Sequence, residues 1–358
     1  YDLNLRIAGA LTSDQVVHIP KVLYHWRATE TSVAGNSQQK NYAIENAYKA
    51  LADFMATQGI DGEIAEVPGT TWHRIRYALP GDPPLVSLVI PTRNGHQILK
   101  VCIDSIIEKT TYPKVEILVV DNGSDDPEAL AYFKQIEAEG KAKVLPYPHP
   151  FNYSAINNFA VKQAKGQVVA LVNNDIEVIT PEWLEEMVSL ALRPGIGCVG
   201  AKLYYPNDTV QHAGIVLGIG GVAGHSHKYY PRNSNGYFGW LKLPHNVSAV
   251  TGACLMVRKD IYESVGGLDE ENLKVAFNDV DFCLRVMQAG YANVFTPYAE
   301  LYHHESLSRG SEDNPEKQAR FEREVTYMLN RWGPRLTRDP NYSPHLTLRR
   351  EDFSINVD

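Results

Sequence analysis

Short polar clusters follow apolar, β-branched runs at three points in the sequence. The clusters are Pro91-Thr92-Arg93-Asn94, Asp121-Asn122-Gly123-Ser124 and Asn173-Asn174-Asp175. One such cluster alone is typical of a turn or a helix cap, because Asn, Asp, Gly and Ser favour both. Three clusters after the first, second and fourth predicted strands favour a polar binding site, since ligands of parallel sheets bind at the carboxyl ends of the strands. None of them contains the glycine-rich pattern of a dinucleotide or phosphate loop, which disfavours Rossmann dehydrogenases and P-loop NTPases.

The elements that must position these clusters follow from the hydrophobic periodicity. Apolar runs predict strands over 85–91, 115–121, 143–147 and 168–173. Amphipathic stretches predict helices between them, over 97–109, 127–139 and 154–164. This alternation is typical of βαβ units, so we expect an α/β fold with a mostly parallel sheet and helices on its faces.

The composition limits the classes of protein that need to be considered. The chain of 358 residues is 44% hydrophobic and 21% charged, which is typical of a globular protein with a substantial core. Its formal net charge of −8 disfavours a broad basic surface, so nucleic acid is not an expected partner. No apolar run approaches the roughly 18 to 20 residues that span a bilayer, and we expect a soluble chain or a peripheral membrane protein. Its cysteines, Cys102, Cys198, Cys254 and Cys283, lie in apolar contexts and are expected to be buried free thiols in a reducing compartment.

Two short motifs near the N-terminus recur near the C-terminus in the same order. The segment from Asp2 to Arg6 matches 281–285, and the segment from Ile19 to Trp26 matches 296–304. A polar helical stretch follows each copy, over 38–58 and 314–331. We therefore interpret 1–58 as the C-terminal remnant of an upstream domain of the same type, 59–84 as a linker, 85–310 as the complete domain and 311–358 as a C-terminal helical tail. Because the chain starts at Tyr1, we expect it to be a piece of a longer protein.

Five motifs in this order resemble those of family 2 glycosyltransferases with the GT-A fold. They are the run ending Ile-Pro91-Thr-Arg-Asn94, Ile-Leu-Val-Val-Asp121-Asn-Gly-Ser124, Leu-Val-Asn173-Asn-Asp175, Thr251-Gly252-Ala253-Cys254, and Phe277-Asn278-Asp279-Val280-Asp281 with Leu284-Arg285. The resemblance covers about 85–310 and is strongest to bacterial polysaccharide and O-antigen transferases that carry several catalytic domains. It implies a central sheet flanked by helices, with a Rossmann-like nucleotide-binding half, an acceptor half, and extra helical segments at both ends.

The resemblance also implies an activity and a set of site residues. Such enzymes take a sugar from a nucleotide-diphosphate donor, usually with a divalent metal, and invert the anomeric centre. The implied nucleoside pocket consists of Pro91, Thr92, Arg93, Asn94, Asp121 and Asn122, with Asp121 accepting a hydrogen bond from the base. The segment Asn173-Asn174-Asp175 matches the D-x-D metal motif, and His303 matches a histidine that completes the metal site. Asp279 matches the catalytic base.

Two departures from the family pattern affect this interpretation. Asn173 replaces the first acid of the metal motif, so we expect weak metal affinity before the nucleotide binds. A neutral His303 fits Mn²⁺ better than Mg²⁺, and the alternative for His303 is packing beside Tyr302. Asn278 stands where the family often has Glu, which leaves any acceptor contact of that Glu in doubt.

Several polar residues have both a structural and a functional interpretation. Asp279 begins a helix predicted over 279–289, where it is either a base or a cap, and the helix N-terminus is expected to lower its pKa. We assign structural roles to Asp281 and Arg285. Asn152 and Asn157 either contact the donor or cap a helix. Trp183, after Thr180-Pro181-Glu182, is expected to pack in the core beside a helix start.

A glycine-rich insert contains three histidines, His212, His225 and His227. It resembles an acceptor-side loop, which we favour over a zinc site because an H-x-H pattern alone is weak.

The leading hypothesis is an inverting, metal-dependent transferase that extends a cell-surface polysaccharide at the cytoplasmic face of a membrane. Its partners would be a nucleotide-sugar donor, a glycan or lipid-linked glycan acceptor, and the upstream domain of the same polypeptide. One alternative is a sugar nucleotidyltransferase, although its glycine-rich, arginine-containing loop is absent after 85–91. Another is a non-catalytic domain that binds nucleotide-sugar or glycan and supports an active partner domain.

Overall fold

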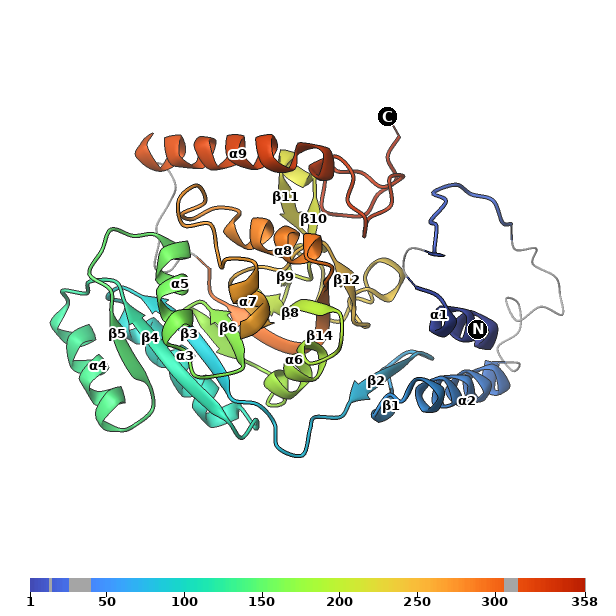
Figure 1. The fold of residues 1–358 in the computed structure, drawn as a ribbon, viewed down its shortest axis with the longest axis horizontal. Helices are drawn as coiled ribbons and strands as arrows, with labels where there is room; N and C mark the ends of the chain where they lie inside the picture. Colours follow the sequence, from blue (N-terminus) through green and yellow to red (C-terminus); the bar gives the residue numbers. More distant parts are fainter. Residues whose placement is uncertain (13–14, 26–39, 306–314, 358) are drawn as a thin grey trace. The chain divides into compact units, whose positions relative to one another are not determined.

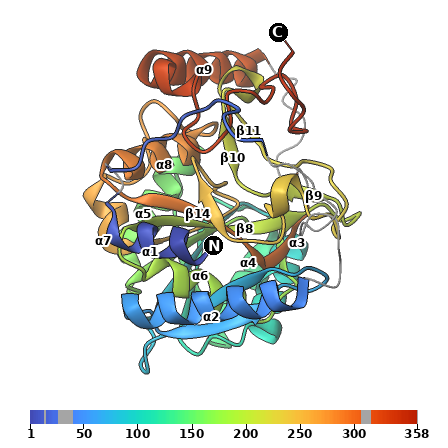
Figure 2. The ribbon, with the colours of Figure 1, turned by 90° about the vertical axis from the view of Figure 1, so that its right-hand side faces the viewer.

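The computed structural model describes residues 1–12, 15–25, 40–305 and 315–357. It divides into two compact units, Tyr1–Ala78 and Leu79–Asp358. The first unit contains two helices, α1 (Asp2–Ala10) and α2 (Lys40–Gln58), that contact each other, and a hairpin of β1 (Gly62–Glu66) and β2 (His73–Tyr77). The hairpin lies within the segment interpreted as a linker. Figure 2 shows α1 and α2 in blue.

The structure adds one parallel between the two copies of the sequence repeat and one difference. In α1 the Arg6 Nε lies 3.0 Å from an Asp2 carboxylate oxygen, and in α8 (Asn278–Gln288) Arg285 Nε lies 2.8 Å from Asp281 Oδ2. Both pairs have the same i, i+4 spacing on a helix. The second motif differs, because its described residues 19–25 form no strand whereas 296–303 lie in a strand. Trp26 lies outside the described residues. The domain boundaries drawn from the repeat remain a prediction.

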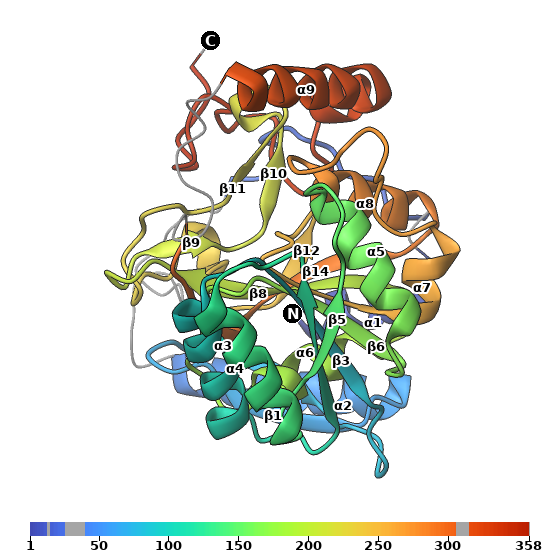
Figure 3. The same cartoon turned by 90° about the vertical axis from the view of Figure 1, so that its left-hand side faces the viewer.

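The second unit is built on a ten-stranded sheet, and its first half has the predicted βαβ pattern. The order β5-β4-β3-β6 is parallel throughout and is formed by β3 (Val86–Thr92), β4 (Val115–Asp121), β5 (Lys143–Pro146) and β6 (Val168–Val172). The crossover helices are α3 (His96–Lys109), α4 (Pro127–Ala138) and α5 (Tyr153–Gln163). The chain moves outward from β3 to β5 and then returns to β6. Right-handed crossovers therefore place α3 and α4 on one face and α5 on the other, as Figure 3 shows.

The second half of the sheet is mixed. It contains β7 (Ile176–Val178), β8 (Ile196–Tyr204), β9 (Val210–His212), β12 (His245–Val247), β13 (Cys254–Arg258) and β14 (Ala292–His303), with α6 (Trp183–Ala191) and α7 (Lys259–Ser264). Strand β13 is antiparallel to β6 and β8, whereas β14 is parallel to β8. Because Cys254 pairs with Val172, the residues just before β13 lie at the carboxyl edge of the parallel strands. The end of β14 lies at the same edge, where His303 pairs with Ile176 of β7.

A further hairpin and a long helix complete this unit (Figure 1). The hairpin consists of β10 (Ile215–Leu217) and β11 (Ala223–His225), joined through the 3-10 turn Ile219–Gly221, and a second 3-10 turn covers Tyr237–Gly239. Helix α9 (Pro315–Leu336) buries Met328, Trp332 and Leu336 in the main core cluster. Among the described residues, no helix is long and apolar enough to cross a bilayer.

Two smaller predictions about the core are confirmed. All four cysteines are buried free thiols. Trp183 is fully buried, and its indole Nε1 donates to Thr110 Oγ1 at 3.0 Å. The helix begins at Trp183 itself, two residues later than the Thr180-Pro181 signal indicated.

Candidate active site

A cavity of about 560 Å³ lies at the carboxyl edge of the parallel strands. Eight of the predicted site residues line it, namely Pro91, Thr92, Arg93, Asn122, Asn173, Asn174, Asp175 and His303. They come from the ends of β3, β4, β6 and β14. The sheet topology thus brings together residues that lie more than a hundred positions apart in the sequence: Asn173 Nδ2 is 3.3 Å from His303 Nε2.

Two residues predicted for the nucleoside pocket are used to shape the loops beside the cavity. Asn94 Oδ1 accepts hydrogen bonds from the backbone N–H groups of Asp125 and Asp126, each at 3.0 Å. Asp121 Oδ1 accepts from the Ser124 backbone N–H at 2.8 Å. Neither residue is among those lining the cavity. Asn94 and Asp121 therefore join the loops after β3 and β4, and a direct contact of either with a nucleoside remains a prediction.

Asn152 and Asn157 also lie outside the cavity lining. Asn152 is the N-cap of α5: its Oδ1 accepts from the Ala155 backbone N–H at 3.1 Å, and its Nδ2 donates to the Glu270 carbonyl at 2.8 Å. Asn157 is fully buried within α5, and its Nδ2 donates to the Tyr153 carbonyl at 2.8 Å. For Asn152 the geometry matches the capping alternative, whereas Asn157 neither caps the helix nor reaches the cavity.

A carboxylate, an amide and an imidazole meet at one wall of the cavity. His303 Nε2 lies 3.1 Å from Asp175 Oδ1 and 3.3 Å from Asn173 Nδ2. The neighbouring Asn174 turns away from them and donates from Nδ2 to Thr92 Oγ1 at 3.1 Å. Asn173, Asp175 and His303 are therefore the members of the predicted metal motif that converge.

Gln211, at the centre of β9, determines which nitrogen of His303 faces this group. Gln211 Oε1 lies 2.6 Å from His303 Nδ1, and its Nε2 donates to the His303 carbonyl and to Glu305 Oε2. An amide oxygen can only accept, so Nδ1 carries a proton and Nε2 is the ring nitrogen that faces Asp175 and Asn173. This arrangement is typical of a metal-binding histidine held by a neighbouring residue. Sequence reasoning missed Gln211, because nothing near it in the chain indicates the pairing with His303.

These residues fit a divalent cation that also binds the substrate. Among the residues that the structure describes, no cluster of three or more His, Cys, Asp or Glu side chains is suited to a metal ion. The donors present are one carboxylate, one imidazole lone pair and one amide. Mn²⁺ accepts this mixture of oxygen and nitrogen, but the low charge of the set means that tight binding requires further oxygen ligands, such as those of a diphosphate.

The Asp279 carboxylate does not line the cavity but contacts the backbone of a segment that does. Its Oδ2 accepts from the Gly252 backbone N–H and its Oδ1 from the Val280 N–H, both at 2.8 Å. Thr251 and Ala253, on either side of Gly252, line the cavity. Burial raises the pKa of Asp279, whereas the N–H groups of Gly252 and Val280 and the Thr251 hydroxyl oppose that shift. The expectation that the helix N-terminus would lower this pKa is therefore wrong, because desolvation is the larger effect.

Comparison with known proteins decides the family. The profile described as "Glycosyl transferase family 2" matches residues 87–266, half of the chain. The chain belongs to this family. The match begins within β3 and ends after β13, so it contains all of the cavity walls that come from β3, β4, β6 and β13.

Relatives and a solved structure agree with this assignment. The chain is 51% identical to the uncharacterized protein y4gI of Sinorhizobium fredii and 39% identical to the O-antigen biosynthesis protein RfbC of Myxococcus xanthus. Each alignment covers 99% of this chain but only 39% and 27% of the respective relatives, so the chain spans less than half of their length. The crystal structure of GalNAc-T7 with UDP, GalNAc and Mn²⁺ matches with a TM-score of 0.56 at 15% identity, over 71% of this chain and 50% of that one. This likeness confirms the predicted GT-A fold.

The cavity of this family 2 glycosyltransferase has a cationic lining. Arg93, Lys228, Lys317 and Arg320 line it together with two carboxylates, those of Asp175 and Glu305. Lys317 and Arg320 come from α9. Sequence reasoning missed both, since they lie in a segment that was interpreted as a tail.

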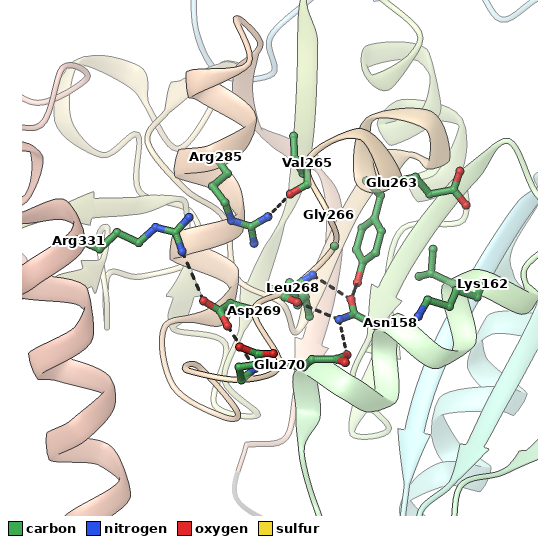
Figure 4. A pocket seen from close by; sticks show the side chains of 14 residues that line it. Asn158, Lys162, Glu263, Val265, Gly266, Leu268, Asp269, Glu270, Arg285 and Arg331 are labelled. Carbon is green, nitrogen blue, oxygen red and sulfur yellow. Dashed lines mark hydrogen bonds and ion pairs between the residues drawn. The ribbon is translucent and has the colours of Figure 1, made fainter.

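A second hollow, of about 590 Å³, lies between α5, α8, α9 and the segment after α7 (Figure 4). Its polar side chains are largely bonded to one another. The Asn158 side chain, for example, bonds the Tyr262 hydroxyl, the backbone of Leu268 and the Glu270 carboxylate. It shares no lining residue with the cavity at the carboxyl edge. We interpret this hollow as part of the framework that supports α8.

Proposed function

We propose that this chain is an inverting, metal-dependent glycosyltransferase domain that moves a sugar from a nucleotide-diphosphate donor to a glycan or lipid-linked glycan. The observation that carries the proposal is the convergence of Asn173, Asp175 and His303 on one wall of a cavity whose neighbouring wall is backed by Asp279. The family assignment supports glycosyl transfer in general.

The base in this proposal is Asp279. The hydroxyl of the acceptor must lose a proton as it attacks the anomeric carbon, and a carboxylate within hydrogen-bond reach can take it. Each oxygen of Asp279 accepts one backbone N–H and keeps lone-pair capacity for another proton donor. These main-chain groups hold the carboxylate beside Thr251 and Ala253 of the cavity lining.

The leaving group in this proposal is held at the wall formed by Asn173, Asp175 and His303. Asp175, Asn173 and His303 would hold the divalent cation, which when bound offsets the charge of the departing diphosphate. Asp175 supplies the negative charge of this set, and Gln211 keeps the His303 lone pair directed toward it. Asn173 adds an amide, which is also bonded by the Tyr153 hydroxyl at 3.3 Å.

The biological setting of the proposal is the synthesis of a cell-surface polysaccharide. Support comes from the name of the Myxococcus relative, which assigns that protein to O-antigen biosynthesis. We place the reaction in the cytoplasm, at the inner face of the membrane, with an upstream domain of the same polypeptide as the partner. The parallel between the ion pairs of α1 and α8 supports the existence of such a domain.

Calorimetric titration with UDP, GDP, dTDP and CMP, with and without Mn²⁺, tests the proposal. We expect one diphosphate to bind selectively and more tightly when Mn²⁺ is present. The matching nucleotide-sugars should then be hydrolysed slowly or transferred by the wild-type protein. Absence of binding to every nucleotide would contradict the proposal. Metal-enhanced binding without any cleavage of the nucleotide-sugar would instead favour the non-catalytic alternative.

A further inference from the structure

Two residues of the glycine-rich insert, His225 and Lys228, line the same cavity as Asp175 and His303. His225 ends β11, and Lys228 follows it by three positions. Neither residue belongs to the five motifs that resemble the family or to the metal motif. Their surroundings determine what kind of ligand they are able to bind.

Hydrogen bonds fix the tautomer of His225. The fully buried His212 accepts at Nε2 from the backbone N–H groups of Gly214, at 3.3 Å, and Thr251, at 3.4 Å. Its proton is therefore on Nδ1, which lies 2.9 Å from Nδ1 of His225. His225 must accept that hydrogen bond at Nδ1, so its own proton is on Nε2. Within the described part of the chain no protein group bonds this Nε2, and it is the ring nitrogen that remains for a ligand in the cavity.

His225 remains neutral while it presents this N–H. Burial, with smaller contributions from Lys228 and His303, lowers the pKa of His225 to about 4. Burial also lowers the pKa of His212, so the pair is uncharged at neutral pH. His225 is therefore a fixed neutral donor beside the metal motif, and Lys228 supplies the positive charge.

Lys228 is held between two anchored residues with unusual backbone angles. His227 and Tyr229 have backbone φ angles of 57° and 65°, in a region that residues other than glycine rarely adopt. His227 accepts from the Tyr237 backbone N–H at 3.0 Å and stacks on Phe353, and Tyr229 stacks on Tyr205 of the cavity lining. Backbone strain of this kind occurs where the surrounding structure holds a functional group in place.

A diphosphate is the ligand that this pair of donors fits. Asn173 removes one negative charge from the metal motif, so less charge is available to hold a cation against the departing diphosphate. Additional N–H donors and cations in the same cavity would make up for that loss, since hydrogen bonds to charged groups are stronger than those between neutral groups.

We propose that His225 Nε2–H and the Lys228 ammonium bind the terminal phosphate of the nucleoside diphosphate. This inference rests on the proposed function, because it names the part of the donor that these residues recognise. It predicts that both residues contribute to the preference for a diphosphate over the corresponding monophosphate and make little difference to the monophosphate itself.

The experiment compares the affinities of a nucleoside diphosphate and its monophosphate by calorimetry. The nucleotide is the one among UDP, GDP and dTDP that the wild-type protein binds most tightly. The variants are His225→Ala, His225→Gln and Lys228→Ala, with Lys134→Ala on the exposed face of α4 as the matched control. Thermal unfolding of each variant verifies that it is folded. Gln places an amide N–H near the position of the His Nε2, so His225→Gln tests whether a neutral donor is sufficient.

We expect diphosphate binding to weaken roughly 10- to 100-fold in His225→Ala and Lys228→Ala, with monophosphate binding unchanged. His225→Gln should retain much of the preference, and Lys134→Ala all of it. An unchanged preference in both alanine variants would overturn the inference while leaving the proposed function in place. Failure of every diphosphate to bind the wild-type protein would overturn both.

Discussion

Two aspartates on the first turn of α8 differ in what surrounds their carboxylates. Asp281 is fully buried, lies 2.8 Å from Arg285 Nε and accepts from the Trp332 indole at 2.9 Å. Both of its oxygens are thus engaged, one by the guanidinium and one by the indole, and this carboxylate serves the packing of α8 against α9. Within the part of the chain that the structure describes, Asp279 accepts from the backbone N–H groups of Gly252 and Val280 and from the Thr251 hydroxyl. Asp279 is therefore a better candidate for the base than Asp281.

Replacing Asp279 with Asn should lower turnover by orders of magnitude and leave nucleotide affinity nearly unchanged. The amide keeps the shape of the side chain but cannot take the proton of the acceptor. Steady-state kinetics and calorimetry of Asp279→Asn measure the two effects separately. Asp260→Asn, an exposed aspartate of α7, is the matched control and should behave as the wild-type protein does. Turnover that survives in Asp279→Asn would remove it from the role of base.

The pH dependence of turnover should reflect the burial of Asp279. Burial raises its pKa in the folded protein, so as the pH is lowered the base becomes protonated, and inactive, at a higher pH than an ordinary Asp does. The turnover number should thus fall as the pH is lowered through this raised pKa. A kcat profile from about pH 4 to 8 measures it. The residual activity of Asp279→Asn should lack this acidic limb, and an identical limb in both proteins would assign it to another group.

Replacing Gln211 with Leu should weaken Mn²⁺ binding in the presence of nucleotide by roughly 10- to 100-fold. The change removes the acceptor of the His303 Nδ1 proton, so Nε2 is no longer held facing Asp175 and Asn173. Calorimetric titration of Mn²⁺ into the nucleotide complex gives the affinity. Gln135→Leu on the exposed surface of α4 is the control. Equal Mn²⁺ affinity in Gln211→Leu and wild type would argue against His303 as a ligand.

At the scale of elements, α9 determines the position of the segment that precedes α8. The carboxylate of Glu324, 2% exposed, accepts the backbone N–H groups of Val275 and Ala276, each at 3.0 Å. One turn further on, the Tyr327 hydroxyl donates to Asp269, and Arg331 lies 3.4 Å from the same carboxylate. The segment that carries Asp279 is therefore held by α9 as well as by its own helix.

Replacing Glu324 with Ala should destabilise the protein by about 1 to 3 kcal/mol, because it leaves two backbone N–H groups without their acceptor. Turnover should fall as well, since the segment leading to Asp279 is no longer fixed. Chemical denaturation and steady-state kinetics measure these changes. Glu322→Ala is the control, because this side chain is exposed on the same helix. Unchanged stability in Glu324→Ala would show that the contact does not hold the segment.

The elements that could be predicted from the sequence are those with local signals. Strands β3 and β6 are buried on both faces, so their sequences are continuous apolar runs that stand out between helices. Strand β14 was not predicted, because it contains Pro297 and its register with β8 shifts between Phe295 and Glu300. The part of the site that depends on such distant pairing, Gln211 with His303, was missed for the same reason. Motif resemblance identified His303 itself, which periodicity did not.

At the scale of the whole molecule, the charge of the site is opposite in sign to that of the chain. The chain carries a formal net charge of −8, yet four of the six Lys, Arg, Asp and Glu side chains among the described residues of the cavity lining are cationic. A low-dielectric cavity lined by an excess of one sign of charge attracts ligands of the opposite charge. The cationic lining therefore favours an anionic ligand. Because the rest of the protein is acidic, such a ligand would bind in this cavity and not across the protein surface.

The two compact units differ in what they contribute to this site. Each described residue that lines the cavity belongs to Leu79–Asp358, and the described members of the main core cluster lie in the same unit. Deleting 1–78 should therefore leave nucleotide binding unchanged and preserve a cooperative thermal transition. Deleting 315–358 should abolish both, because it removes Met328, Trp332 and Leu336 from the core. Calorimetry and thermal unfolding of the two truncations test the contrast. Loss of nucleotide binding in the first would make Tyr1–Ala78 an integral part of the nucleotide-binding domain and contradict the interpretation of 1–58 as an upstream remnant and of 59–84 as a linker.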